Sequence, residues 1–182
     1  MTSLWPSAPG EVTVVPPLRF APVPNVVVDV AAWALFHAAT GYAVHRLPLA
    51  RLQRDNWLLK PRHFEHDGRL YERFRIRRWK DTLPEAGALF PGGMSKRHII
   101  HSDARGLRRF AAETRRAELG HWSAAACGPL FVLWNPPVVA AVMIAYGVLI
   151  NAPFIAIQRY NRLRIGRVLA RRNGSSSPSD VA

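Results

Sequence analysis

The sequence is poor in cysteine and in acidic residues. Its 182 residues include one cysteine, Cys127, which excludes an internal disulfide and a metal site built from several cysteines. Asp and Glu number 12 against 25 Lys and Arg, so the formal net charge is +13 at pH 7. An excess of this size predicts an anionic partner, either nucleic acid or anionic lipid.

A second absence is that of charge over a long stretch of chain. No charged side chain lies between Ser123 and Ile157. Within this block the sequence Trp-Asn-Pro-Pro at 134–137 predicts a tight reversal, because proline cannot continue a helix and extends the residue before it. The arm after the reversal is long enough to cross a bilayer, which takes about 20 residues. We therefore predict a membrane hairpin over 122–157, whose first arm, 122–134, is either a short span or a re-entrant half.

The first 25 residues are rich in proline, which predicts an extended arm over 1–25. Residues 26–44 are apolar over a spanning length, and we favour a retained first transmembrane helix over a cleaved signal because no basic cluster precedes it. Asp29, Trp33 and His37 recur at every fourth position and share a face that should point into protein. Two interpretations stay open: either Asp29 lies near the headgroups and His37 hydrogen-bonds to a neighbouring helix, or this face has a role in proton transfer.

Residues 45–121 form a basic segment, predicted to be cytoplasmic or interfacial. Arginines concentrate there and in a basic polar cluster at 158–172, so the positive-inside rule places both, with the C-terminus, in the cytoplasm. Asp67-Gly68 predicts a turn with positive φ, and Ser102 with Asp103 predicts a helix cap. Residues 70–79 fit either a helix or a strand, and 173–182 should be a disordered tail. The predicted class is a mainly α integral membrane protein with about three membrane helices.

A candidate catalytic face precedes the hairpin. Thr114, Glu118 and His121 fall at i, i+4 and i+7 of a predicted helix, with Glu113 at the flank. A carboxylate beside an imidazole orients the ring and makes it basic enough to take a proton from a hydroxyl, which acyl transfer to an alcohol requires. In the alternative, Glu118 pairs with an arginine, either Arg115 or Arg162, and the histidine only hydrogen-bonds at the interface.

A second polar cluster follows the apolar block and consists of Gln158, Arg159, Asn161 and Arg162. Its arginines are expected to hold a phosphate or a carboxylate, or to meet Glu113 and Glu118; anchoring to headgroups is the alternative. The central geometric expectation is that these two clusters come together. Asn151 and Pro153 are expected to interrupt the last span just before it.

Several motif matches are too weak to carry a function. Glu118-x-x-His121 has the spacing used in di-iron bundles, but the sequence has no second Glu-x-x-His, so no metal is predicted. His98 and Asp103 match the His-x4-Asp pattern of glycerolipid acyltransferases, a match expected by chance in a chain with seven histidines. The loop at 91–96 lacks the spacing of a phosphate-binding loop.

Four segments together carry a resemblance to a known family. They are Arg78-Trp79-Lys80-Asp81-x-Leu83-Pro84, Gly92-Gly93-x-Ser95-Lys96, Glu113-Thr114-x-Arg116-Ala117-Glu118-Leu119-x-His121-Trp122 and Asn151-x-Pro153-x-Ile155-x-x-Gln158-Arg159-Tyr160-Asn161-Arg162. In this order they resemble the glycosyl-4,4'-diaponeurosporenoate acyltransferase family. The resemblance implies a small enzyme of the bacterial cell membrane that esterifies the sugar of a carotenoid glycoside with a fatty acyl group.

Two functional hypotheses follow. In the first, the protein is a membrane acyltransferase in carotenoid biosynthesis, with His121 as general base, Glu118 orienting it and Glu113 assisting. Substrate contacts are expected from Trp79, Lys80, Lys96, Gln158, Arg159, Asn161 and Arg162. The acyl donor is a co-substrate such as an acyl thioester, and no other cofactor is expected. In the second, the chain is a non-catalytic adaptor that binds anionic membrane lipid and a partner complex. Nucleic-acid binding is not favoured, because no reading motif accompanies the arginines.

Overall fold

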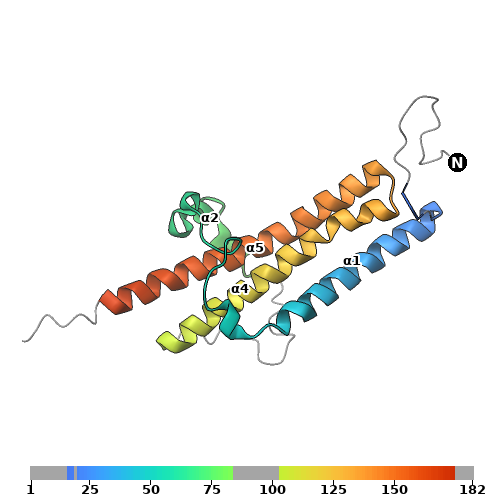
Figure 1. The fold of residues 1–182 in the computed structure, drawn as a ribbon. Helices are drawn as coiled ribbons and strands as arrows, with labels where there is room; N and C mark the ends of the chain where they lie inside the picture. The colour runs from blue at the N-terminus through green and yellow to red at the C-terminus, as the bar shows by residue number, and fades with distance from the viewer. Residues whose placement is uncertain (1–15, 19, 84–102, 175–182) are drawn as a thin grey trace, which may run out of the picture. The chain divides into compact units, whose positions relative to one another are not determined.

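The computed structural model describes residues 16–18, 20–83 and 103–174. This part of the chain is helical and holds no strand (Figure 1). The elements are α1 (Pro22–His45), η1 (Leu49–Leu52), η2 (His63–Gly68), α2 (Arg69–Arg73), α3 (Ile76–Trp79), α4 (Ala104–Ala126), η5 (Gly128–Leu133) and α5 (Pro137–Gly174). The mainly α class is confirmed, and the segment at 70–79 is helical.

The described residues form two compact units. Unit 1 combines the residues up to Ala43 with Gly120–Pro153, and unit 2 combines Val44–Leu119 with the residues from Phe154 onward. Helices α4 and α5 each contribute one part to each unit. The residues of a unit are therefore distant in sequence, and long-range packing decides which polar groups meet.

Helix α1 starts earlier than predicted. Pro22 and Pro24 lie in its first turn, where the missing N–H of proline leaves no hydrogen bond unmade, so the prolines end the arm without delaying the helix. The face expected to point into protein is only partly buried: Asp29 and Trp33 are buried, whereas His37 is exposed. His37 Nδ1 lies 2.8 Å from the carbonyl oxygen of Trp33, a bond within its own helix rather than to a neighbour.

Aromatic packing holds unit 1 together. Trp33 of α1 stacks on Phe131 of η5 with ring centroids 4.9 Å apart, and Trp134 packs against the same phenylalanine. Gly147 of α5 faces the indole so closely that a Cβ at this position would collide with it. The glycine is thus required for the approach of α5 to Trp33.

A buried polar group accompanies this core. Asp29 Oδ1 accepts hydrogen bonds from Trp134 Nε1 at 2.7 Å and from Asn135 Nδ2 at 2.8 Å, and Asn25 donates to Asn135 Oδ1 at 2.6 Å. The reversal predicted at 134–137 is confirmed, and Asn135 in it bonds to the first turns of α1. Asp29 is therefore hydrogen-bonded inside the protein.

Two of the described helices are long and apolar enough to cross a membrane, α1 and the 137–172 part of α5. Only 11% and 22% of their most apolar windows are buried within the protein. The predicted middle element does not pass this test: α4 runs to Ala126, and a 3-10 turn, η5, follows instead of a further helical arm.

Unit 2 is built on the charged parts of α4 and α5. Asp103 Oδ1 accepts a hydrogen bond from Gly106 N at 2.7 Å and so caps α4 as predicted, while Ser102 lies outside the described residues. Leu107 and Phe110 of α4 pack against Ile165 of α5. Ile76 of α3 packs with Tyr160 of α5, which is fully buried.

The turn predicted at Asp67-Gly68 is present and longer than expected. His66, Asp67 and Gly68 all have positive φ, at 45°, 55° and 98°. Residues other than glycine rarely adopt this backbone conformation, and each one that does lowers the stability of the fold by on the order of 1 kcal/mol or more. Such a cost persists only where the surrounding contacts impose it.

The last helix differs from its prediction. Asn151 and Pro153 do not interrupt it, since α5 is continuous from Pro137 to Gly174. The Asn151 side chain donates to Gly147 O at 2.8 Å, a bond to its own helix that keeps the amide from competing with the backbone. The start of the predicted tail, Asn173 and Gly174, belongs to α5. The loop at 91–96, with Lys96, and His98 lie outside the described residues.

Candidate functional site

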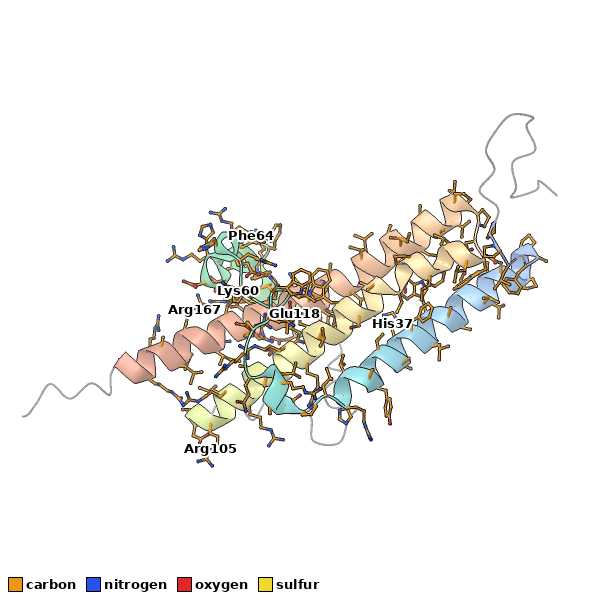
Figure 2. All side chains as sticks on the ribbon, viewed as in Figure 1. His37, Lys60, Phe64, Arg105, Glu118 and Arg167 are labelled. Atoms are coloured by element: carbon orange, nitrogen blue, oxygen red, sulfur yellow. The ribbon has the colours of Figure 1, made fainter. Side chains whose placement is uncertain are left out.

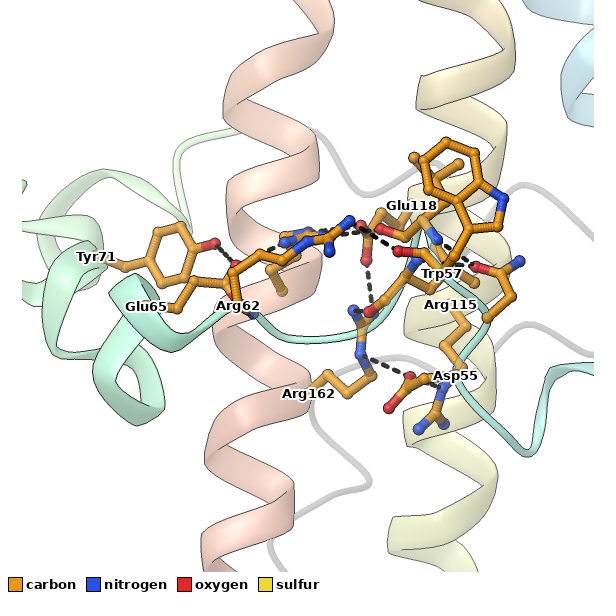
Figure 3. Close-up of polar contacts among 12 residues, drawn as sticks. Asp55, Trp57, Arg62, Glu65, Tyr71, Arg115, Glu118 and Arg162 are labelled. Carbon is orange, nitrogen blue, oxygen red and sulfur yellow. Dashed lines mark hydrogen bonds and ion pairs between the residues drawn. The ribbon is translucent and has the colours of Figure 1, made fainter.

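Unit 2 contains a buried ion-pair network formed by Asp55, Glu65, Glu118, Arg159 and Arg162 (Figure 3). Arg159 Nε lies 2.6 Å from Glu118 Oε1, and Arg162 Nη1 lies 2.6 Å from Glu118 Oε2. Each oxygen of Glu118 therefore faces one guanidinium. The expected meeting of the two sequence-distant clusters is confirmed for these three residues, and Arg162 is one of the two partners that the alternative interpretation gave to Glu118.

Glu65 is the member that sequence analysis missed. Its Oε1 lies 2.7 Å from Arg159 Nη1 and accepts a hydrogen bond from Tyr71, and its Oε2 accepts one from Arg62 N at 2.6 Å. Glu65 lies two residues before Asp67 of the Asp-Gly turn. The positive φ values of the residues that follow it turn the backbone back toward the surface, while the Glu65 carboxylate remains buried. A carboxylate three residues after Arg62 was the one available signal, because that spacing fits a helix-capping box.

The network pairs its buried charges, but the Nε and Nη1 atoms of Arg162 make no hydrogen bond within the described residues. Arg159 Nη2 donates to Leu58 O and Arg162 Nη2 to Leu59 O, both at 2.6 Å, so both guanidiniums also fix the chain at 58–59. At the edge, Asp55 Oδ1 lies 2.6 Å from Arg115 Nε and 3.7 Å from Arg162 Nε. Buried charges that are paired in this way hold a structure together.

The electrostatics of the turn follow from these contacts. Burial alone would raise the pKa of Glu65, but hydrogen bonds from Tyr71, Arg62 N and Arg159 outweigh it and hold that pKa below its usual value. Burial and the neighbouring Glu65 carboxylate raise the pKa of the Tyr71 phenol above its usual value. Glu65 is thus ionised and Tyr71 neutral near pH 7.

Unit 1 contains the other candidate group, His121. Its Nδ1 lies 2.9 Å from Asn151 Oδ1, while Asn151 Nδ2 donates to Gly147 O at 2.8 Å. The amide must present its oxygen to the ring, since the reverse orientation would place two oxygens together at Gly147. Nδ1 is therefore the protonated nitrogen, and Nε2 carries the lone pair of the neutral imidazole.

His121 belongs to α4, outside both candidate spans. Burial lowers the pKa of its imidazole below the usual value and the nearby His37 lowers it further, while the bond to Asn151 partly opposes this shift. The neutral, proton-accepting form is thus the form present near pH 7. Sequence analysis noted Asn151 only as a helix interruption and missed it as the partner of the imidazole.

The other predicted site residues have contacts of their own. Glu113 pairs with Arg116 at 3.0 Å, and Arg116 also donates to Leu47 O. Trp79 Nε1 donates to Phe74 O, and Lys80 pairs with Asp81 at 2.7 Å. The half-buried side chains of Gln158 and Asn161 take no part in the network. The substrate roles of these residues stay predictions, and Lys96 is outside the described residues.

Among the described residues no three His, Cys, Asp or Glu side chains lie together as a metal site would require. The contact between His121 and Asn151 is suited to proton transfer at a neutral imidazole.

Comparison with known proteins gives the class. The family model for glycosyl-4,4'-diaponeurosporenoate acyltransferase matches residues 55–171. Two relatives from Staphylococcus aureus, strains MRSA252 and bovine RF122 / ET3-1, carry this name and are each 30% identical over 126 residues, 68% of this chain and 75% of theirs. No solved structure matches.

The matched range includes the whole ion-pair network as well as His121 and Asn151. The family and these relatives are named as acyltransferases, so the protein is an enzyme of the acyltransferase class. It belongs to the glycosyl-4,4'-diaponeurosporenoate acyltransferase family, as the four motifs predicted.

Proposed function

We propose that this protein transfers a fatty acyl group from an acyl thioester to a hydroxyl of a lipid-soluble glycoside in pigment biosynthesis. The relatives are named for acylation of a glycosyl carotenoid acid, and membership of their family supports the same reaction class here. The observation that carries the proposal is the chain of contacts from Gly147 O through Asn151 to His121 Nδ1.

His121 acts as the general base. Because Asn151 holds the proton on Nδ1, Nε2 takes the proton from the attacking hydroxyl as the oxygen forms its bond to the acyl carbonyl carbon. The carbon–sulfur bond then breaks, and the protonated imidazole returns the proton to the leaving thiolate. The products are an ester and a free thiol, and the histidine regains its neutral state.

Asn151 is the residue that we propose to orient the imidazole. Glu118, predicted for that role, has both oxygens in ion pairs with arginines, so we assign it to the scaffold of unit 2. Glu113 pairs with Arg116, so we propose that it assists the reaction only indirectly, by positioning Arg116. Gln158 and Asn161 retain amide groups able to contact a substrate carbonyl.

The acceptor and the acyl chain are apolar, and we propose that they reach the enzyme through the lipid. The exposed apolar surfaces of α1 and α5 support membrane insertion by these two helices. The arginines of residues 45–121 and of the end of α5 support a cytoplasmic location for unit 2.

The test is ester formation in cells that make a carotenoid glycoside acceptor. We expect extracts from cells with the wild-type protein to contain the acylated glycoside by mass spectrometry, and His121→Gln to reduce it at least 100-fold at equal membrane content. Thr40→Ala is the matched control, since it removes a side chain of the same unit that bonds only backbone carbonyls of α1 in the structure.

Retained ester with His121→Gln would contradict the assignment of the base. Loss of ester with His37→Gln alone would favour the proton-transfer role considered for the α1 face. A non-catalytic adaptor predicts no acylated product from any variant, and the family membership argues against it.

A further inference from the structure

A pocket of about 330 Å³ lies on unit 2 beside the strained turn. It is lined by Pro61, Arg62, His63, His66, Asp67 and Leu163. Its volume is at the lower end of the roughly 300–1,000 Å³ typical of ligand pockets. The apolar contribution comes from a proline and from one leucine of α5, and the other four side chains are polar.

Among the described residues, three of the four polar side chains around this pocket make no contact that holds the fold. Within the described part of the chain, the side chains of His63, His66 and Asp67 make no hydrogen bond or ion pair, although Glu65 between them is fully engaged in the network. The turn thus directs one carboxylate inward and leaves three polar groups around the pocket. Conformational strain at His66 and Asp67 accompanies this arrangement, as it often does at ligand sites.

Arg62 provides a preorganised cation. Its Nη2 donates to Trp57 O at 2.8 Å, which fixes the guanidinium, and in the described residues no carboxylate side chain is paired with it. A guanidinium has five N–H donors, so several remain for a ligand. Figure 3 shows Arg62 between Glu65 and Trp57.

We infer that this pocket binds a phosphate group, and that the phosphate is the one carried by the acyl donor. A fixed guanidinium with two imidazoles is suited to a phosphate oxyanion, and the basic excess of the chain favours an anion over a neutral polyol. Arg159 and Arg162, the other cations expected to hold the donor, are committed to carboxylates and carbonyls. The inference rests on the proposed function for the identity of the donor; an anionic lipid headgroup presents the same chemistry.

The pocket contains one carboxylate, Asp67, so substitutions of Arg62 and of Asp67 should change phosphate binding in opposite directions. Arg62→Gln removes the cation and should weaken phosphate binding about tenfold or more. Asp67→Asn removes a repulsive charge, keeps a side chain that tolerates positive φ, and should strengthen binding about threefold. Arg105→Gln is the control, since it removes an equal charge from an exposed position at the start of α4 (Figure 2).

The experiment is isothermal titration of the full-length protein in maltoside micelles, which contain no phosphate. Coenzyme A is the first probe and phosphatidylglycerol vesicles are the second. We expect coenzyme A to bind with the order Asp67→Asn tighter than wild type, wild type equal to Arg105→Gln, and Arg62→Gln weakest. The same order with the vesicles alone would assign the phosphate to a lipid headgroup instead of the donor.

Equal affinities for wild type and Arg62→Gln, or binding weakened by Asp67→Asn, would overturn the inference. A thermal unfolding scan of each variant separates these outcomes from misfolding. Failure of the proposed function looks different: coenzyme A would bind with the expected order, but no ester would form. Conversely, if Arg62→Gln forms ester with an unchanged KM for the donor, the pocket does not bind the donor, while the proposed acyl transfer still stands.

Discussion

Asn151 accepts a hydrogen bond from His121 Nδ1 and at the same time donates to Gly147 O. The orientation of the amide therefore determines that Nδ1 is the ring nitrogen that carries the proton. The two residues lie thirty positions apart on α4 and α5, inside unit 1. This relationship assigns the basic nitrogen of the candidate site without reference to any carboxylate.

The first prediction concerns Asn151. Asn151→Ala should lower kcat for acyl transfer by about 10- to 100-fold, because the imidazole loses the partner that fixes its tautomer and orientation. KM for the acceptor should change little. Asn56→Ala is the control: it removes an asparagine that bonds Leu58 N and Leu59 N, and kcat per folded molecule should not fall. An equal loss of kcat in both variants would point to general destabilisation.

The second prediction is the acid limb of the pH profile. A general base is active when neutral, so kcat/KM should fall as the pH drops through the pKa of His121 in the free enzyme. Because burial and His37 lower that pKa, the midpoint should lie below the usual histidine value of about 6.5. A profile of kcat/KM against pH, from roughly 4.5 to 8, measures it. A midpoint above 6.5 would mean that a carboxylate stabilises the imidazolium.

Sequence patterns predicted much of the fold because several of its elements are specified by strong local signals. The absence of charge between Ser123 and Ile157, the Pro136-Pro137 reversal and the cap at Asp103 are local signals, and the structure confirms the reversal and the cap. Local signals also misled: Pro153 was expected to break a helix that continues through it, because one lost hydrogen bond is outweighed by the apolar helix on both sides.

The third prediction concerns the buried ion pairs. Glu118→Gln should destabilise the protein by about 3–5 kcal/mol, since it leaves Arg159 and Arg162 buried with one partner fewer. Arg77→Gln, which removes an exposed ion pair with Glu72 and a hydrogen bond to the Tyr160 hydroxyl, should cost clearly less. Unfolding monitored by tryptophan fluorescence in detergent compares the two. Equal small losses would show that solvent reaches the network.

The fourth prediction follows from the pKa of Glu65. Its folded-state pKa is depressed, so its stabilising contribution is complete above the unfolded value, about 4.3, and disappears as the pH falls through the lower folded value. Glu65→Gln should therefore be much less stable than wild type at pH 7, and the difference should shrink at pH values below about 4. A difference that stayed constant across this window would contradict the ionised state of Glu65.

The fifth prediction tests the packing of unit 1. Gly147→Ala places a methyl group against the Trp33 indole and should cost about 1–3 kcal/mol. Gly166→Ala on the same helix meets nothing within 4 Å and should be neutral or stabilising by up to about 1 kcal/mol, the helix preference of alanine over glycine. Thermal unfolding of the two variants gives the comparison, and an unaffected Gly147→Ala would show that Trp33 moves freely.

The candidate site was only half accessible from the sequence. Helical spacing identified Glu118 and His121 as residues of interest, and the family motifs identified Arg159 and Arg162. No spacing rule pairs Glu65 with Arg159, which are 94 positions apart, or Asn151 with His121. Such pairs arise from tertiary packing, and the motifs could not tell a committed arginine from one available to substrate.

The most direct test of the catalytic claim uses purified protein, an acyl thioester and an alkyl glucoside acceptor, with the ester product measured by mass spectrometry. The account predicts steady ester formation by wild type, the same rate within about twofold for Thr40→Ala, and a loss of at least 100-fold for His121→Gln with unchanged thermal stability. Wild-type turnover by His121→Gln would contradict it.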